Sequence, residues 1–203
     1  MLEVGLTGCR FSGKTSVSKL FRKIGVPVFD ADTVLKFILN FKPKVELAIM
    51  ANVGSFVYKN GFLDPKCFLT DGLFDRTIDL VEFELFQAWE RFKDKHSDHS
   101  YVIFKSSILF ERKWEDKFDK LISVYAPKDE RIYRGVNLGN KIDKVKTDIN
   151  KEISDNDKNV NSDYIIHNYD HFDCDILKQA NLIDIDLVDL SINSNFKSIV
   201  LWK

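Results

Sequence analysis

The stretch Gly8-Cys-Arg-Phe-Ser-Gly-Lys-Thr15 decides the fold of this chain. It has the spacing G-x-x-x-x-G-K-[ST], in which small residues let the backbone N–H groups of a loop surround a chain of phosphates. An apolar run at residues 2–7 precedes the loop, and residues 16–24 follow it with apolar residues at helical spacing. A strand, this loop and a helix in that order indicate a site for the phosphates of a nucleotide.

The two residues that close the motif have separate expected tasks. Lys14 would place a positive charge on the outer phosphates, and the Thr15 hydroxyl can be a ligand of Mg²⁺. The helix that begins here would also direct the positive end of its dipole at the phosphates.

The next segment predicts how the chain returns to the sheet. Gly25 is placed to end the helix, and residues 26–30 form a short β-prone run. Residues 2–30 therefore predict a strand–helix–strand unit, which implies a parallel sheet and an α/β fold. Asp30 and Asp32 lie at the end of the second strand, at the edge of the sheet where the loop also lies. Either carboxylate could accept a substrate proton or help to hold Mg²⁺, or it could only cap a helix that begins near Thr33.

The rest of the chain predicts more helices and strands around this unit. Residues 140–163 are rich in Lys, Asp and Asn with a thin apolar stripe, which indicates either a lid or an ordinary solvated helix. The tail after Leu182 shows no clear period. Further elements are expected as a helix at 31–52 that breaks at Pro43, a turn at Asn60-Gly61, a long helix at 77–92, and strands at 101–104, 121–125 and 163–167.

Composition excludes several classes of protein. The chain has 203 residues, of which 44% are hydrophobic and 30% charged, with a net charge of −1. These values are typical of a globular domain and rule out an overall basic surface for nucleic acid. No apolar run approaches the roughly 18 residues that span a bilayer. Cys9, Cys67 and Cys174 are an odd number without a C-x-x-C pair, which favours a reducing compartment.

Three other patterns suggest different chemistry. Residues 140–143 spell Asn-Lys-Ile-Asp, a guanine-reading tetrapeptide of GTPases, but no glycine has an aspartate three residues before it, as a GTPase would also require. His167, His171 and Cys174 could contribute to a metal site, although no fourth ligand is evident. Cys9 lies near a helix start, which can lower a thiol pKa and favour oxidation.

Two segments resemble the opening of the dephospho-CoA kinase family: Gly5-Leu-Thr-Gly-x-x-x-Ser-Gly-Lys-Thr, and Gly25-Val-Pro-Val-Phe-Asp-Ala-Asp32. Weaker similarities follow at residues 60–64, 109–111, 121–127 with Arg134, and 163–168. The resemblance implies Mg²⁺- and ATP-dependent phosphorylation of the ribose 3′-hydroxyl of dephospho-CoA. It implies a three-layer P-loop NTPase fold, with residues 1–203 as one domain, a helical insertion at about 40–95 and a lid at about 128–160.

The resemblance also implies the roles of individual residues. Asp32 would be the base or would orient the ribose hydroxyl, Lys14 would bind phosphate, and Arg134 would stabilise the transferred group. Asn168 would lie at the adenine-binding loop, although it could equally be an ordinary turn residue. The remaining contacts to ATP would come from Gly8, Phe11, Ser12, Gly13, Lys14, Thr15 and Ser16. We expect a small-molecule substrate, no nucleic acid or membrane partner, a monomer or weak homo-oligomer, and a cytoplasmic location.

The chain also departs from the family pattern. Cys9, Arg10 and Phe11 replace Gly, Ile and Gly, and a phenylalanine is not expected to adopt the positive φ that glycine allows. Ser107 stands where the family has proline. Leu138 stands where it has a second arginine, which Lys141 or Lys144 would have to replace. Two alternatives therefore stay open: a kinase for another small molecule, and a nucleotide-binding relative without activity.

Overall fold

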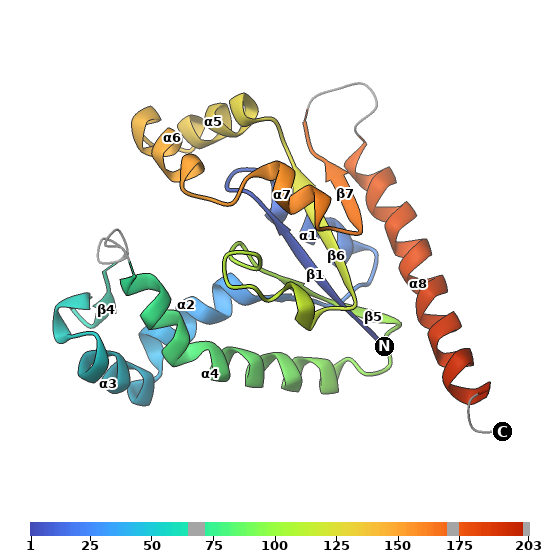
Figure 1. Ribbon diagram of the computed structural model, residues 1–203, viewed down its shortest axis with the longest axis horizontal. Coiled ribbons are helices and arrows are strands. Elements are labelled where there is room, and N and C mark those ends of the chain that lie inside the picture. The colour runs from blue at the N-terminus through green and yellow to red at the C-terminus, as the bar shows by residue number, and fades with distance from the viewer. Residues whose placement is uncertain (65–71, 170–174, 201–203) are drawn as a thin grey trace. The chain divides into compact units, whose positions relative to one another are not determined.

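The computed structural model describes residues 1–64, 72–169 and 175–200 (Figure 1). The chain divides into two compact units. The first contains Met1–Phe29 and His96–Lys203, and the second contains Asp30–Lys95. The predicted division into one kinase domain with an insertion and a lid stays a prediction.

A five-stranded sheet forms the centre of the first unit, in the order β2-β5-β1-β6-β7. The central strand β1 pairs in parallel with β5 on one side and β6 on the other, and β6 pairs in parallel with β7. This order confirms the parallel sheet that the sequence predicts. The strands are β1 (Leu2–Gly8), β2 (Val28–Asp30), β5 (Tyr101–Lys105), β6 (Lys120–Tyr125) and β7 (Tyr164–His167).

One face of the sheet is covered by α1 (Lys14–Lys23) and α8 (Ile176–Val200). Alternate strand residues point to this face because successive side chains of a strand alternate between its two sides. Phe21 of α1 and Leu187 of α8 are fully buried against them. The core on this side also contains Val4, Leu6, Val17, Tyr101, Ile103, Ile122, Val124, Ile166, Ala180 and Ile183.

The opposite face is covered by the segment after β5, with its short helix η3 (Glu115–Lys117), and by α7 (Asp155–Val160). The Phe104 ring lies 6.1 Å from Trp114 and 5.1 Å from Phe118, centroid to centroid. Ser123 Oγ of β6 donates a 2.8 Å hydrogen bond to Asn159 Oδ1 of α7. With both faces covered, the unit has the three layers that the sequence predicts.

Two helices, α5 (Lys128–Asn137) and α6 (Ile142–Asn150), lie between β6 and α7. We refer to residues 128–160 as the α5–α7 segment. Its thin apolar stripe is used for packing, since Val145 and Ile149 of α6 are buried. A Cβ atom on Gly135 of α5 would lie 2.8 Å from Val145 Cγ1, so α6 packs directly against the α5 backbone there.

The second unit consists of helices and one hairpin. Pro43 begins α3 at the break that the sequence predicts, and Asn60 and Gly61 turn between β3 and β4 with φ of 52° and 79°. The long helix α4 begins before the predicted residue 77 and buries Ile78, Val81, Leu85 and Trp89. The elements are α2 (Ala31–Phe41), α3 (Pro43–Asn52), η1 (Ser55–Val57), β3 (Tyr58–Lys59), β4 (Phe62–Leu63) and α4 (Leu73–Lys95).

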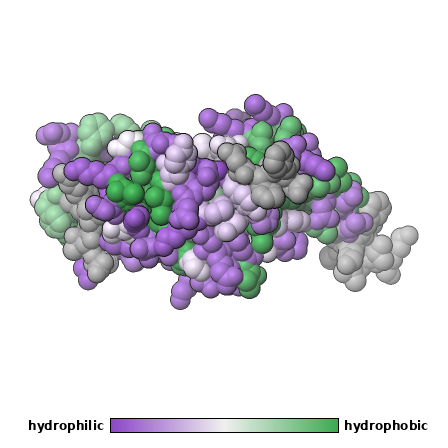
Figure 2. Space-filling model, turned by 90° about the horizontal axis from the view of Figure 1, so that it is seen from above, coloured by the Kyte–Doolittle hydropathy of each residue, from purple (hydrophilic) through white to green (hydrophobic). Residues whose placement is uncertain are grey.

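Hydrophilic residues dominate the surface drawn in Figure 2, where apolar residues form small patches. Over residues 1–64, 72–169 and 175–200, the helices lack the combination of length and apolar composition needed to cross a membrane.

The tail that the sequence leaves unassigned forms α8, and two of its leucines offer a matched test. Leu187 is fully buried, whereas Leu182 is 59% exposed on the same helix. Leu187→Ala should lower the free energy of unfolding by about 2–5 kcal/mol because it removes packed atoms and leaves a cavity. Leu182→Ala should change it by no more than about 0.5 kcal/mol. Urea unfolding measures both; equal losses would contradict the packing of α8.

Candidate functional site

The loop at residues 9–13 connects β1 to α1 and leaves the start of that helix open. Gly13 has φ of 94°, in the left-handed region, and α1 begins without a side-chain cap or an acidic residue in its first turn. The first N–H groups of a helix have no partner within the helix. An uncapped helix start that follows a tight loop is therefore suited to bind an anion.

Lys14 is held inside the loop. Its Nζ donates hydrogen bonds to the carbonyls of Gly8 at 2.7 Å and Cys9 at 2.9 Å, and the residue is only 9% exposed. These charge-assisted bonds fix the ammonium group beside the open start of α1.

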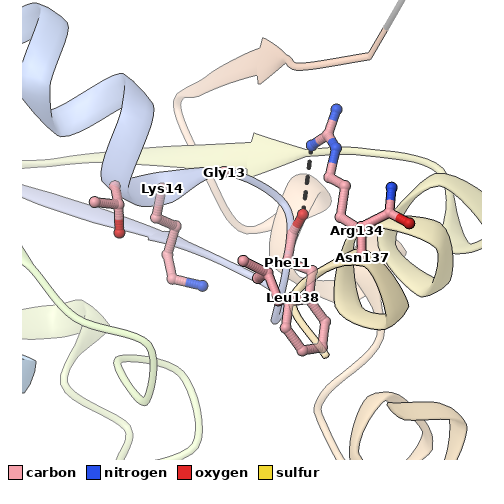
Figure 3. A pocket seen from close by; sticks show the side chains of 7 residues that line it. Phe11, Gly13, Lys14, Arg134, Asn137 and Leu138 are labelled. Carbon is pink, nitrogen blue, oxygen red and sulfur yellow. Dashed lines mark hydrogen bonds between the residues drawn. The ribbon is translucent and has the colours of Figure 1, made fainter. Parts of the chain in front are cut away.

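Arg134 of α5 binds the other side of the loop (Figure 3). Its Nη1 donates to the carbonyls of Phe11 at 3.4 Å and Ser12 at 3.3 Å, and its Nη2 donates to the Asn168 carbonyl at 2.8 Å. Its Nε donates to Glu130 Oε1 at 3.0 Å. The guanidinium group thus connects the loop, α5 and the residue that follows β7.

Asn168 completes this arrangement. Its Nδ2 donates a 2.7 Å hydrogen bond to the Ser12 carbonyl, and its own N–H donates to the Tyr125 carbonyl at 2.8 Å. The Arg10 carbonyl accepts a 3.5 Å hydrogen bond from Arg131 Nη1. Each backbone carbonyl from residue 8 to residue 12 therefore accepts a hydrogen bond from a side chain.

A cavity of about 490 Å³ opens beside the loop. It is lined by five residues that the sequence predicts for the site, Phe11, Gly13, Lys14, Thr15 and Arg134, together with Asn137 and with Leu138, the residue at the position of the family's second arginine. Ser12, in the loop, and Asn168 are buried and are not among the described residues that line the cavity. Ser16 is exposed in the first turn of α1, and its N–H donates to the Gly13 carbonyl.

The expectation that Phe11 would avoid a positive φ is wrong. Phe11 has φ of 63°, a conformation that costs a residue with a Cβ atom roughly 1–2 kcal/mol. Its ring packs on α5, since a Cβ atom on Gly135 would lie 2.9 Å from Phe11 Cε2. Phe11 is half-buried, and the packing of its ring against α5 counteracts the backbone strain.

The two candidate aspartates differ in their local roles. Asp30 is the N-cap of α2, and its Oδ1 accepts the Thr33 N–H at 3.2 Å. The capping role expected for one of the pair therefore belongs to Asp30, and the helix begins at Ala31. Asp32 lies in the first turn of α2, within the second unit, and its catalytic role stays a prediction.

Sequence reasoning missed Arg131, which is only 3% exposed. Its Nε donates to the Ala126 carbonyl at 3.2 Å, and its Nη2 forms an ion pair with Asp155. Lys158 was also missed; it is 1% exposed and pairs with Glu111 at 2.6 Å. The spacing of Arg131 and Arg134 places both on one face of a helix, which is the signal that could have drawn attention to the first.

The alternative sites do not gain support. Residues 140–143 span the end of the α5–α6 connection and the first two residues of α6, so they do not follow a strand, and Asn140 Nδ2 donates to the Gly135 carbonyl at 2.9 Å. The GTPase interpretation is therefore wrong. His167 lies in β7, while His171 and Cys174 lie outside the described residues.

The family model of dephospho-CoA kinase (CoaE) matches residues 2–173 of the chain. The chain belongs to the dephospho-CoA kinase family. Members of this family phosphorylate dephospho-CoA, so the chain is a kinase for a small-molecule substrate, and nucleotide binding follows from the same family. The resemblance predicted from its first 32 residues is confirmed.

Similar dephospho-CoA kinases come from diverse bacteria. That of Rhizobium meliloti (strain 1021) is 30% identical over 186 residues, which cover 85% of this chain and 92% of the relative. That of Bacteroides fragilis (strain ATCC 25285) is 29% identical over 178 residues, which cover 82% and 84%.

Solved structures agree on the fold. TT1252 from Thermus thermophilus has a TM-score of 0.77 at 21% identity and covers 91% of this chain and 96% of its own. Dephospho-CoA kinase from Campylobacter jejuni has a TM-score of 0.62 at 16% identity and covers 92% and 97%. A shikimate kinase from Acinetobacter baumannii shares the fold as well, with a TM-score of 0.55 at 14% identity. The match covers 92% of this chain and 94% of the shikimate kinase.

Cys9 does not have the lowered pKa that its place near a helix start predicts. Burial raises the pKa of Cys9 from 9.0 to about 12, and its Sγ donates to the Ile153 carbonyl at 3.4 Å.

Labelling with iodoacetamide tests this burial in a variant with Cys67→Ser and Cys174→Ser, in which Cys9 is the one remaining cysteine. At pH 8, Cys9 should react much more slowly in the folded protein than in the urea-unfolded protein, because only the thiolate reacts.

The same pKa shift has a consequence for stability. The folded state holds the Cys9 proton more tightly than the unfolded state does. The resulting contribution to the free energy of unfolding is therefore fully present below pH 9 and is lost as the pH rises from 9.0 to about 12.

For the labelling experiment, equal rates for folded and unfolded protein at pH 8 would contradict the burial of the Cys9 thiol.

Gly13 and Gly25 offer a matched pair for the loop. Both have φ of 94°, but a Cβ atom on Gly13 would lie 1.9 Å from Asn168 Nδ2, whereas one on Gly25 would meet nothing within 4 Å. Gly25→Ala should lower the unfolding free energy by only about 1–2 kcal/mol, the cost of a left-handed alanine. Gly13→Ala should lower the unfolding free energy by more than this, because it also displaces the hydrogen bond from Asn168 to the Ser12 carbonyl, and it should weaken ATP binding. Urea unfolding measures the stability of both variants, and calorimetry measures ATP binding. Equal losses of unfolding free energy in the two variants would contradict the close approach of Asn168 to Gly13.

Proposed function

We propose that this chain transfers the terminal phosphoryl group of ATP to the ribose 3′-hydroxyl of dephospho-CoA in a Mg²⁺-dependent reaction. One observation carries the proposal: a single cavity lined by Lys14, Thr15 and Arg134 in a chain of the dephospho-CoA kinase family. Two cations and a hydroxyl group around a phosphate loop are among the parts that phosphoryl transfer uses.

The nucleotide end of the site uses the backbone as well as charge. The uncapped start of α1 and the Lys14 ammonium group would hold the phosphates, with Gly13 and the neighbouring N–H groups of the loop around them. The side-chain amide of Asn168 is committed to the Ser12 carbonyl. We therefore assign Asn168 an indirect role, in which it keeps the loop in shape for the nucleotide.

The residues at the cavity fit a magnesium ion. Thr15 lines the cavity beside Lys14, and a hydroxyl oxygen is a hard ligand of the kind that Mg²⁺ accepts together with phosphate oxygens. When bound, Mg²⁺ would neutralise charge on the outer phosphates. Arg134 would add a second positive charge for the group in transfer.

Asp32 is the proposed residue for the acceptor. A carboxylate can accept the proton of the ribose hydroxyl or fix its direction, and the neighbouring Asp30 already serves as the cap of α2. The α5–α7 segment is proposed to act as a lid that keeps water from the phosphates and so limits wasteful hydrolysis of ATP.

Formation of ADP from Mg-ATP, with and without dephospho-CoA, tests this function. Wild type should form ADP much faster with dephospho-CoA, and Asp32→Asn should lower that rate about 10²- to 10⁴-fold, the usual contribution of a general base. Binding of ATP should change little, because Asp32 is assigned to the acceptor. Phosphate on the 3′-position of the product, located by NMR, checks the hydroxyl.

Asp30→Asn is the matched control, since asparagine caps a helix about as well as aspartate. It should retain most of the activity. Collapse in Asp30→Asn but not in Asp32→Asn would move the base to Asp30. If wild type forms ADP no faster with dephospho-CoA, the proposed acceptor is wrong; a panel of other hydroxyl acceptors then separates another kinase from a relative that only binds nucleotide.

A further inference from the structure

Arg10 is a residue of the phosphate loop that is not among the described residues lining the cavity. Its side chain contacts the α5–α7 segment instead. Its Nη1 lies 2.5 Å from Asp148 Oδ2, and its Nε lies 3.8 Å from Glu152 Oε1. The guanidinium group therefore joins two carboxylates, one on α6 and one just after it.

The backbone of Arg10 binds the same segment. Its N–H donates a 2.8 Å hydrogen bond to Glu152 Oε2, and its carbonyl accepts from Arg131 Nη1 at 3.5 Å. Glu152 Oε2 also lies 3.9 Å from Arg131 Nη1. One loop residue thus contacts the α5–α7 segment through its N–H, its carbonyl and its side chain.

These contacts form a network rather than an isolated surface pair. Two guanidinium groups, of Arg10 and Arg131, face three carboxylates, of Asp148, Glu152 and Asp155. The side chains of Asp148 and Glu152 are only 18% and 19% exposed and that of Arg131 is 3% exposed, whereas the Arg10 side chain is 50% exposed. The half-exposed Arg10 thus pairs with carboxylates of low exposure, and charges in such a network couple more strongly than single exposed pairs.

We propose that Arg10 is a positioning residue that clamps α6 onto the phosphate loop and so sets the affinity for ATP. The inference rests on the proposed function, because it takes the loop as the site of the ATP phosphates. Arg10 lies between Cys9 and Phe11, whose carbonyls are held by Lys14 and Arg134. Loss of the Arg10 side-chain ion pairs would leave only the backbone contacts of Arg10 to hold the midpoint of the loop, and would raise the cost of ordering the loop around phosphates.

A double-mutant cycle on binding tests the clamp without turnover. The probe is the non-hydrolysable analogue AMP-PNP with Mg²⁺, titrated by calorimetry. Arg10→Met and Asp148→Asn should each raise its Kd by roughly threefold to tenfold, which corresponds to a coupled ion pair. The double variant should bind no worse than Arg10→Met alone, and Arg10→Lys should lie between wild type and Arg10→Met.

The control is Asp143→Asn, the same change of charge on an exposed residue of the same helix. It should leave the Kd unchanged. The clamp is wrong if Asp148→Asn tightens binding while Arg10→Met weakens it, since Arg10 would then act through charge alone. It is also wrong if Arg10→Met leaves the Kd unchanged, or if the two effects simply add.

Kinetics supply a second readout. Arg10→Met should raise the KM for ATP by a similar factor and change the KM for dephospho-CoA much less, whereas general loss of folded protein would lower only the apparent kcat. Because AMP-PNP binding needs no acceptor, the cycle can succeed even if dephospho-CoA proves to be the wrong substrate. Failure of the clamp and failure of the proposed acceptor are therefore separate results.

Discussion

A backbone loop that offers its N–H groups to phosphates must find other partners for its carbonyls, because buried carbonyls need hydrogen-bond donors. In this chain, side chains meet that need at every carbonyl from residue 8 to residue 12. Lys14 serves the first two, Arg131 the third, and Arg134 the last two, with Asn168 sharing Ser12. The shape of the loop therefore depends on three cationic side chains and an amide.

This requirement explains why α5 lies where it does. Arg131 and Arg134 are on one helix, three residues apart, so one face of α5 serves adjacent carbonyls of the loop. The helix follows β6 directly, and β6 pairs with β1, the strand that leads into the loop. Parallel pairing brings both strand ends to one edge of the sheet, so the arginines need no long connection to reach their partners.

The structure explains two positions at which this loop departs from the family pattern, Arg10 and Phe11. Phe11 adopts a left-handed backbone and packs on Gly135, and Arg10 pairs with Asp148 and Glu152. Both substitutions replace small or apolar residues with side chains that contact the α5–α7 segment. Leu138 lines the cavity at the end of α5, and Lys141 and Lys144 are not among the described residues that line it.

Local patterns predicted much of the fold, and the failures have physical causes. The strand–loop–helix unit, the break at Pro43 and the turn at Asn60-Gly61 depend on neighbours in the chain, so sequence alone determines them. The tail after Leu182 did not show its helix because exposed Leu182, Ile185 and Ile192 add apolar residues to the outer face of α8. They obscure the helical period of the buried residues.

The sequence by itself determined the phosphate loop, the parallel sheet and the kinase family, because residues 5–32 hold the motif and its context in one continuous stretch. Only the tertiary structure decided which side chains support that loop. Arg131 is 121 residues from Arg10, and Asn168 is 156 residues from Ser12. Contacts over such separations arise from the packing of β6 and β7 beside β1, which no local pattern of residues records.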